Sequence, residues 1–206
     1  MSVACFALFF LSLIGHVWSG WAKFNNDQQE KGQASVSLVH FLGSGDFMET
    51  LFENWESEFL QMGIYVVLTA MLFQLGSPES KKPDDSPPTE PKIRKDSPWP
   101  VKKGGFVAKL YAHSLSVSLL LLFVLSFTLH VIGGARAHNE KAVEEHRPTM
   151  TITEFAGSSE LWYQSFQNWQ SEFLSIGLIV VLSIYFRERG SSQSKAVEAP
   201  HSETGS

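Results

Sequence analysis

Residues 54–60 read NWESEFL, and 114 positions later residues 168–174 read NWQSEFL. The match continues on both sides of this motif at the same spacing and without a gap. Residues 1–72 and 115–186 share roughly 25 identities, whereas unrelated segments of this length share a single-digit number. Self-similarity of this extent indicates two copies of one structural unit. We therefore expect a fold that is built twice.

Each copy contains two long segments without charge. The chain has no charged residue in 1–22, 59–78, 110–135 and 173–186. A helix needs about 20 residues to cross the hydrocarbon core of a bilayer, and the first three segments are long enough. The fourth is shorter, but it is equivalent to the second, and a helical stripe of aromatic residues precedes it. A signal peptide is the alternative for the first segment, but no basic residue precedes its apolar run.

The sequence therefore predicts an all-α integral membrane protein with four transmembrane helices. The helices are expected at about residues 2–22, 47–76, 109–135 and 159–187. Because each copy holds an even number of helices, the two copies should have the same orientation and form parallel tandem repeats. The expected divisions are a first repeat at 1–76, a flexible linker at 77–108, a second repeat at 109–188 and a disordered tail at 189–206.

Basic residues are concentrated outside the two copies. Residues 76–109 hold eight of the 16 Lys and Arg residues, and the tail from residue 187 adds three. The loops inside the copies share five basic and 13 acidic residues. Lys and Arg accumulate on the cytoplasmic side of membrane proteins. The sequence predicts a multi-pass protein of the cell inner (plasma) membrane, with the linker and both termini cytoplasmic and both acidic loops outside.

Polar residues repeated within the apolar segments are the candidate functional residues. Small and polar residues on one helix face allow helices to approach and hydrogen-bond across the contact. A carboxylate at the edge of the hydrocarbon is costly unless it is hydrated or paired, so it also raises a functional hypothesis. The predicted polar layer consists of Ser12, His16, Asn54, Glu58 and their counterparts Ser126, His130, Asn168 and Glu172.

This layer has two interpretations. In the favoured one, each histidine and glutamate form a hydrogen bond inside one repeat and lock its helix pair. In the alternative, both pairs meet and bind a divalent cation or relay protons.

The approach to the second helix of each copy carries helix-start and interface signals. Asp46 with Glu49 has capping-box spacing, and Ser158 is a candidate N-cap. Trp55 and Trp169 are expected at headgroup depth as interfacial anchors.

Motifs of soluble enzymes are absent from the sequence. The chain has no phosphate-binding glycine loop, no HExxH, no dinucleotide fingerprint and no GxSxG. It also has one cysteine, which excludes a cysteine-based metal cluster. We therefore expect no enzyme, no cofactor and no committed metal site, and a membrane enzyme stays open as the third interpretation. The lipid bilayer is the expected partner, with no nucleic acid, and a channel built from four helices would require a homo-oligomer.

The duplicated NWxSEFL entry, with the upstream His and Gly, resembles a family of bacterial multi-pass membrane proteins of unknown function. The resemblance covers residues 1–76 and 110–186 but not the linker. It implies a bacterial inner-membrane protein and carries no activity. Taken together, the sequence favours a structural, interaction or envelope-related role. The alternative is a small ion or proton transporter or channel that uses His16, His130, Glu58 and Glu172.

Overall fold

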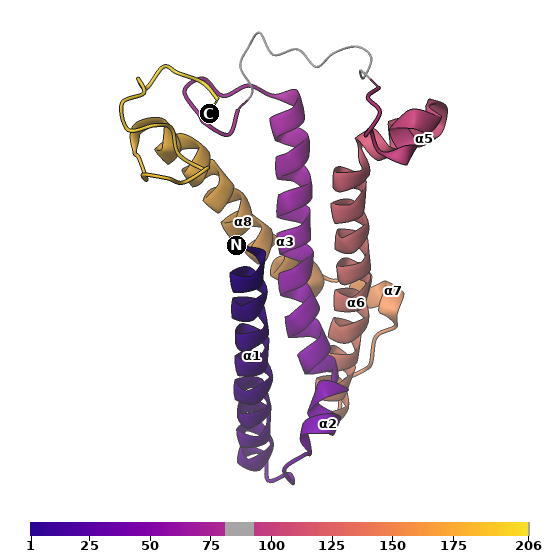
Figure 1. The fold of residues 1–206 in the computed structure, drawn as a ribbon. Helices are drawn as coiled ribbons and strands as arrows, with labels where there is room; N and C mark the ends of the chain where they lie inside the picture. Colours follow the sequence, from indigo (N-terminus) through magenta and orange to yellow (C-terminus); the bar gives the residue numbers. More distant parts are fainter. Residues whose placement is uncertain (81–92, 206) are drawn as a thin grey trace. The chain divides into compact units, whose positions relative to one another are not determined.

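The structure is a computed structural model that describes residues 1–80 and 93–205 (Figure 1). These residues form helices, turns and loops, and the described part of the chain contains no strand. This confirms the all-α prediction for the residues described. The helices are α1 (Ser2–Glu30), α2 (Leu38–Leu42), α3 (Gly45–Met71), α4 (Trp99–Lys103), α5 (Gly105–Ala112), α6 (Ser114–Glu144), α7 (Ile152–Ala156) and α8 (Ser159–Tyr185).

The chain divides into two compact units. Unit 1 comprises Met1–Asn54 and Ser126–Tyr163, and unit 2 comprises Trp55–Leu125 and Gln164–Ser206. Unit 1 therefore holds α1, α2, α7 and the adjoining ends of α3, α6 and α8. Unit 2 holds the remaining parts of these three helices together with α4, α5 and the C-terminal tail.

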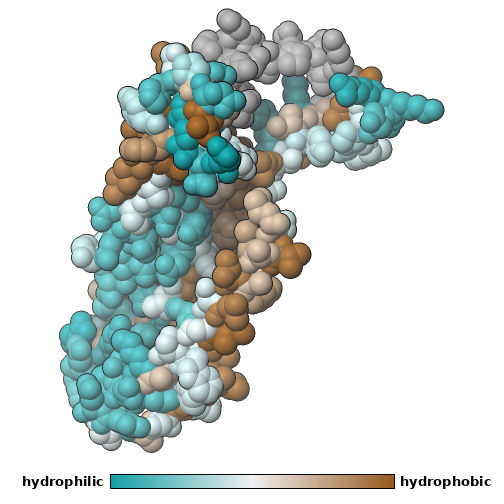
Figure 2. Space-filling view, turned by 60° about the vertical axis from the view of Figure 1, so that its left-hand side comes forward, coloured by the Kyte–Doolittle hydropathy of each residue, from teal (hydrophilic) through white to brown (hydrophobic). Residues whose placement is uncertain are grey.

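Among the residues described, two helices are long and apolar enough to cross a membrane, namely α1 with 29 residues and α6 with 31. All of α1 is described, and none of its residues is buried. Large apolar side chains therefore lie on the molecular surface, where Figure 2 shows brown patches. Leu8 is 65% exposed on α1, and Leu121 is 64% exposed on α6.

Equivalent elements recur at a constant spacing along the chain. The short helices α2 and α7 have five residues each, and α7 begins 114 positions after α2. The long helices α3 and α8 have 27 residues each and are separated by the same 114 positions. The residues before and after the short helices also share their backbone angles: φ is −94° at Gly43 and −93° at Gly157.

The first helix of each copy is longer than its apolar segment. The sequence analysis ended these helices near residues 22 and 135, but α1 continues to Glu30 and α6 to Glu144. The added turns are polar, and polarity does not end a helix, because the helix forms its backbone hydrogen bonds internally. An ion pair one turn apart, between Lys23 Nζ and Asp27 Oδ2 at 2.8 Å, also supports the extension of α1.

Other boundaries also differ from the predicted ones. Helix α6 starts at Ser114 rather than near 109, because the chain leaves helical geometry at His113 and residues 105–112 form the separate helix α5. Helix α3 ends at Met71 rather than near 76, before a turn at Gly76 with φ of +82°. A positive φ is readily adopted by glycine and cannot continue a right-handed helix.

The predicted flexible linker contains two short helices. Residues 81–92 lie outside the described part of the chain, but α4 and α5 fall within the predicted linker and at its end. Pro98 precedes α4, and Pro100 lies in its first turn. Proline is tolerated there because backbone N–H groups in the first turn of a helix have no partner within the helix. The prolines of this segment suggested an extended linker, but Pro98 and Pro100 lie at the start of a helix.

The C-terminal tail, predicted to be disordered, folds back within unit 2. Lys195 is buried, and its Nζ donates hydrogen bonds to the backbone carbonyls of Pro200, His201 and Glu203 at 3.2, 2.9 and 3.0 Å. The end of the tail contacts the turn after α3: the Gly76 N–H donates to Thr204 Oγ1 at 2.9 Å. Backbone carbonyls thus replace the water that a solvated lysine would need.

Candidate functional site

Unit 1 contains the same asparagine bridge twice. Asn25, on α1, accepts a hydrogen bond from the Val36 N–H at 2.7 Å and donates one to the Val36 carbonyl at 3.3 Å. Asn139, on α6, makes the same two bonds to Met150, at 2.8 and 2.9 Å. An asparagine side chain has both a donor and an acceptor, so it satisfies both backbone groups of one loop residue. Each loop is therefore fixed to the helix that precedes it.

A phenylalanine of each short helix packs against a glycine of the preceding long helix. A Cβ atom placed on Gly20 would lie 2.9 Å from the ring of Phe41, and one placed on Gly134 would lie 2.6 Å from the ring of Phe155. Phe41 is 2% exposed and Phe155 is fully buried. The glycine in each copy thus leaves the space in which the phenylalanine ring of the short helix packs.

Serine caps the start of the second long helix in both copies. Ser44 Oγ accepts a hydrogen bond from the Phe47 N–H at 3.2 Å, and Ser158 Oγ accepts one from the Leu161 N–H at 3.3 Å. The prediction for Ser158 is confirmed. The capping box expected at Asp46 is wrong, because the capping residue of α3 lies two positions earlier. The side chain of an N-cap residue must reach the N–H two or three positions on.

Backbone comes very close to backbone where α3 and α6 cross in unit 1. A Cβ atom on Gly133 would lie 2.6 Å from the backbone nitrogen of Glu49 and 2.9 Å from the Met48 carbonyl carbon. A Cβ atom on Gly45 would overlap the backbone of Ala137. Such crossings require glycine on both helices.

Charged pairs in unit 1 join residues at the polar ends of α1, α6 and α8. Lys31 Nζ lies 2.6 Å from Glu144 Oε2, and this hydrogen bond raises the pKa of Lys31 and lowers the pKa of Glu144. Both groups lie beyond the uncharged segments. His138 Nδ1 lies 2.7 Å from Glu160 Oε2, with the histidine mostly buried. Because exposed ion pairs typically contribute below about 1 kcal/mol, the lysine pair orders the loops more than it stabilises the fold.

The residues of the predicted polar layer are divided between the units. His16 and His130 lie in unit 1, together with Ser12, Ser126 and Asn54. His130 and Ser126 are buried, His16 is half-buried, and Ser12 and Asn54 are exposed. His16 Nε2 is buried and has no hydrogen-bond partner among the residues described.

Glu58, Glu172, Asn168, Trp55 and Trp169 lie in unit 2. Glu58 is exposed, and the other four are half-buried. The two carboxylates are near enough to interact electrostatically. The contact between histidines and glutamates stays a prediction.

The most deeply buried carboxylate of unit 2 is one that the sequence analysis missed. Glu56 is fully buried, and its Oε1 accepts a hydrogen bond from the fully buried Ser165 hydroxyl at 2.9 Å. Gln61 is also buried, and its Nε2 donates to the Glu172 carbonyl at 3.0 Å and to Ser175 Oγ at 2.8 Å. Both residues have different counterparts in the second copy, so identity between the copies could not select them. For Glu56 the sequence offers one signal, because it lies one helical turn before the apolar Leu60 and therefore on the same helix face.

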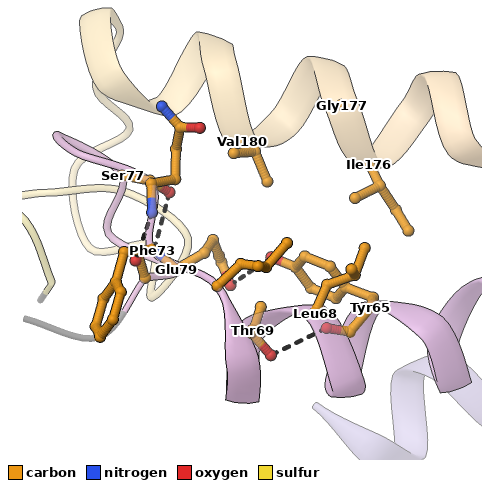
Figure 3. Close-up of a pocket in the computed structure, with 12 residues that line it drawn as sticks. Tyr65, Leu68, Thr69, Phe73, Ser77, Glu79, Ile176, Gly177 and Val180 are labelled. Atoms are coloured by element: carbon orange, nitrogen blue, oxygen red, sulfur yellow. Dashed lines mark hydrogen bonds between the residues drawn. The ribbon is translucent and has the colours of Figure 1, made fainter. Parts of the chain in front are cut away.

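Unit 2 contains an open pocket of about 250 Å³ between α3 and α8 (Figure 3). Its walls are mainly apolar, and Ile176 and Val180 of α8 point toward Leu68 of α3. One end is polar, where the Tyr65 hydroxyl donates a hydrogen bond to Glu79 Oε2 at 2.9 Å. The other lining residues are Thr69, Leu72, Phe73, Gln74, Ser77, Ser80 and Gly177.

Comparison with known proteins identifies the family but no activity. No curated protein matches the chain. No solved structure matches it either. A family described as "Domain of unknown function (DUF6766)" matches residues 1–206, which is the whole chain. The chain, with its all-helical structure and two helices apolar enough to cross a membrane, belongs to the DUF6766 family.

Proposed function

We propose that this protein is a multi-pass inner-membrane protein with a structural or interaction role in the cell envelope. In this proposal four helices, α1, α3, α6 and α8, cross the bilayer as two parallel copies of one two-helix unit. The polar ends of the helices and the loops with α2 and α7 lie on the outer side. The linker, the tail and both termini lie in the cytoplasm.

The observation that carries this proposal is the duplicate construction of the two outer loops. The asparagine bridge, the phenylalanine on glycine and the serine cap occur in both copies at the same spacing. All three connect a loop to its own helices, so they support a rigid loop rather than a mobile gate. A rigid loop between two long helices can form a binding surface for other components of the envelope.

The exposure of α1 supports the membrane setting. Soluble monomers rarely expose contiguous apolar surface beyond a few hundred Å². Helix α1 buries none of its 29 residues, and its side chains from Val3 to Leu11 are largely apolar. Lipid tails would cover such a helix at no hydrophobic cost.

Transport is the second candidate, and two observations bear on it. Among the residues described, no three His, Cys, Asp or Glu side chains are arranged to hold a metal ion. The divalent-cation form stays a prediction, because it needs histidines of unit 1 beside glutamates of unit 2. The proton form would use His16 and His130 with Glu58 and Glu172, and the buried Nε2 of His16 has no hydrogen-bond partner among the residues described.

Reporter fusions test the proposed topology. Reporters that are active only outside the cytoplasm should be active after residue 40 and after residue 150. They should be inactive after residue 90 and after residue 200, because Lys and Arg are concentrated on that side. An external signal at residue 90 would overturn the arrangement.

Proton flux in liposomes separates the structural role from transport. Liposomes containing the purified protein should hold a pH gradient as long as protein-free liposomes do, since a structural protein provides no proton path. A dye reporting internal pH measures the decay. Rapid decay that is abolished in the double variant Glu58→Gln, Glu172→Gln, with normal amounts of inserted protein, would instead establish the transport alternative.

A further inference from the structure

We propose that the pocket between α3 and α8 in unit 2 holds part of one acyl chain of a phospholipid with a primary ammonium headgroup, with the headgroup at Glu79. This inference rests on the proposed function, because it requires α3 and α8 to lie in a bilayer. It assigns to the protein a lipid site of defined chemistry at the cytoplasmic ends of these helices.

The floor of the pocket is kept open by a glycine. No described atom lies within 4 Å of a Cβ atom placed on Gly177. Its counterpart 114 positions earlier is Gly63, where a Cβ atom would meet Leu120 Cδ2 at 3.3 Å and Leu119 Cβ at 3.6 Å. The same repeated glycine thus packs against α6 in one copy and faces open space in the other. Sequence identity alone hides this difference.

The walls determine what can fill the open space. The apolar lining residues are Leu68, Leu72, Phe73, Ile176 and Val180, and Figure 3 shows Ile176 and Val180 pointing toward Leu68 across the open space. Apolar cavities do not hold water, because a water molecule needs two to four polar partners. The hydroxyl of Thr69 is already bonded to the Tyr65 carbonyl at 3.0 Å. A hydrocarbon chain from the surrounding bilayer is therefore the occupant that matches the apolar walls of the pocket.

The size of the pocket limits the occupant to part of a molecule. Sites for complete drug-sized ligands usually measure about 300–1,000 Å³. At about 250 Å³, and open on one side, the pocket accommodates a segment of one chain while the rest of the lipid stays in the bilayer.

The polar end determines the headgroup. Glu79 lies beyond the last turn of α3, and its carboxylate accepts hydrogen bonds from the Tyr65 hydroxyl and from the Gln193 amide of the tail. A carboxylate accepts hydrogen bonds from an ammonium group, and charge-assisted bonds of this kind are stronger than neutral ones. It repels the carboxylate of a free fatty acid, and it accepts only a weaker hydrogen bond from the uncharged hydroxyl of a glycerol headgroup. Phosphatidylethanolamine is the membrane lipid with the matching ammonium group.

Photocrosslinking of the full-length protein in liposomes tests the proposal. The probe is phosphatidylethanolamine with a diazirine in one acyl chain, and mass spectrometry of peptides locates the label. Labelling is expected on residues 65–73 and 176–180. Phosphatidylglycerol with the same chain should label these residues much less. In the variant Glu79→Gln, which keeps the acceptor for Tyr65 but removes the charge, the two probes should become equal.

A matched pair of variants tests the pocket itself. Gly177→Leu should reduce labelling about tenfold, the loss expected when roughly two chain methylenes are no longer buried. The same change at Gly15, a helical glycine of α1 with no described atom within 4 Å, should leave labelling unchanged. Val180→Phe, which also fills the pocket, serves if Gly177→Leu does not fold. Undiminished labelling in a folded filling variant, or equal labelling by both probes in the wild type, would overturn the proposal.

Alkaline carbonate extraction separates this proposal from the proposed function. If the protein is released from membranes, the multi-pass arrangement fails and the lipid site fails with it. If the protein stays in the membrane but the pocket is not labelled, only the lipid site is wrong.

Discussion

Replacing Gly133 with leucine is expected to prevent folding of the protein, which should appear as loss of the monodisperse peak in detergent. The backbones of α3 and α6 meet at this glycine within unit 1, with the backbone nitrogen of Glu49 2.6 Å from the position of a Cβ atom. Overpacking a core costs about 1–3 kcal/mol when side chains can move aside, and more when they cannot. Backbone inside a helix cannot rotate away, so the cost should exceed that range. Such a loss is a large share of a total stability of about 5–15 kcal/mol.

Two other glycines serve as controls for Gly133. Gly15→Leu makes the same chemical change on a helix face where no described atom lies within 4 Å, and it should fold normally. Gly20→Ala should have an intermediate effect, because its neighbour at 2.9 Å is the ring of Phe41, which can shift. Size-exclusion profiles and thermal unfolding in detergent rank the three variants. Equal stability of Gly133→Leu and Gly15→Leu would show that the two helices do not cross as described.

The sequence predicted what depends on the order of apolar and polar residues. The apolar segments gave the positions of the four long helices, and the preference for serine at helix starts gave the cap at Ser158. The helix ends were misplaced because polarity marks the edge of a bilayer, whereas helix ends depend on local geometry such as the positive φ at Gly76. The hydrogen bonds of Lys195 in the tail could not be predicted, because they go to backbone carbonyls, which leave no pattern in the sequence.

The candidate site was predicted only in part for a related reason. Comparing the two copies finds residues that do the same work twice, such as Asn25 and Asn139. The comparison overlooks residues whose role occurs in one copy only. Glu56 is one example, and the open face of Gly177 is another. Phe41 and Phe155 occupy equivalent positions in the two copies, but their packing partners are distant in sequence. Only the folded chain places each ring on its glycine.

Truncating Phe155 to alanine is expected to destabilise the protein by about 3–5 kcal/mol, the usual cost of removing a buried phenylalanine ring. The side chain is fully buried and packs with Val131, Ala135 and Leu161. Phe41→Ala should cost a similar amount, because Phe41 is 2% exposed and contacts the rings of Phe24 and Phe47. Phe106→Ala, at a position 79% exposed, is the control and should have little effect. Denaturant unfolding in detergent measures all three.

The packing of the ring on its glycine makes a sharper prediction in a double variant. Gly134→Ala alone should destabilise the protein, because the new methyl group would lie 2.6 Å from the Phe155 ring. After Phe155→Ala the ring is gone, and the same methyl group enters the space it leaves. The loss from Gly134→Ala should therefore be smaller in the Phe155→Ala background, with a coupling within the roughly 0.5–3 kcal/mol found for residues in contact. Strictly additive losses would mean that ring and glycine do not touch, and the proposed role of the repeated glycine would be wrong.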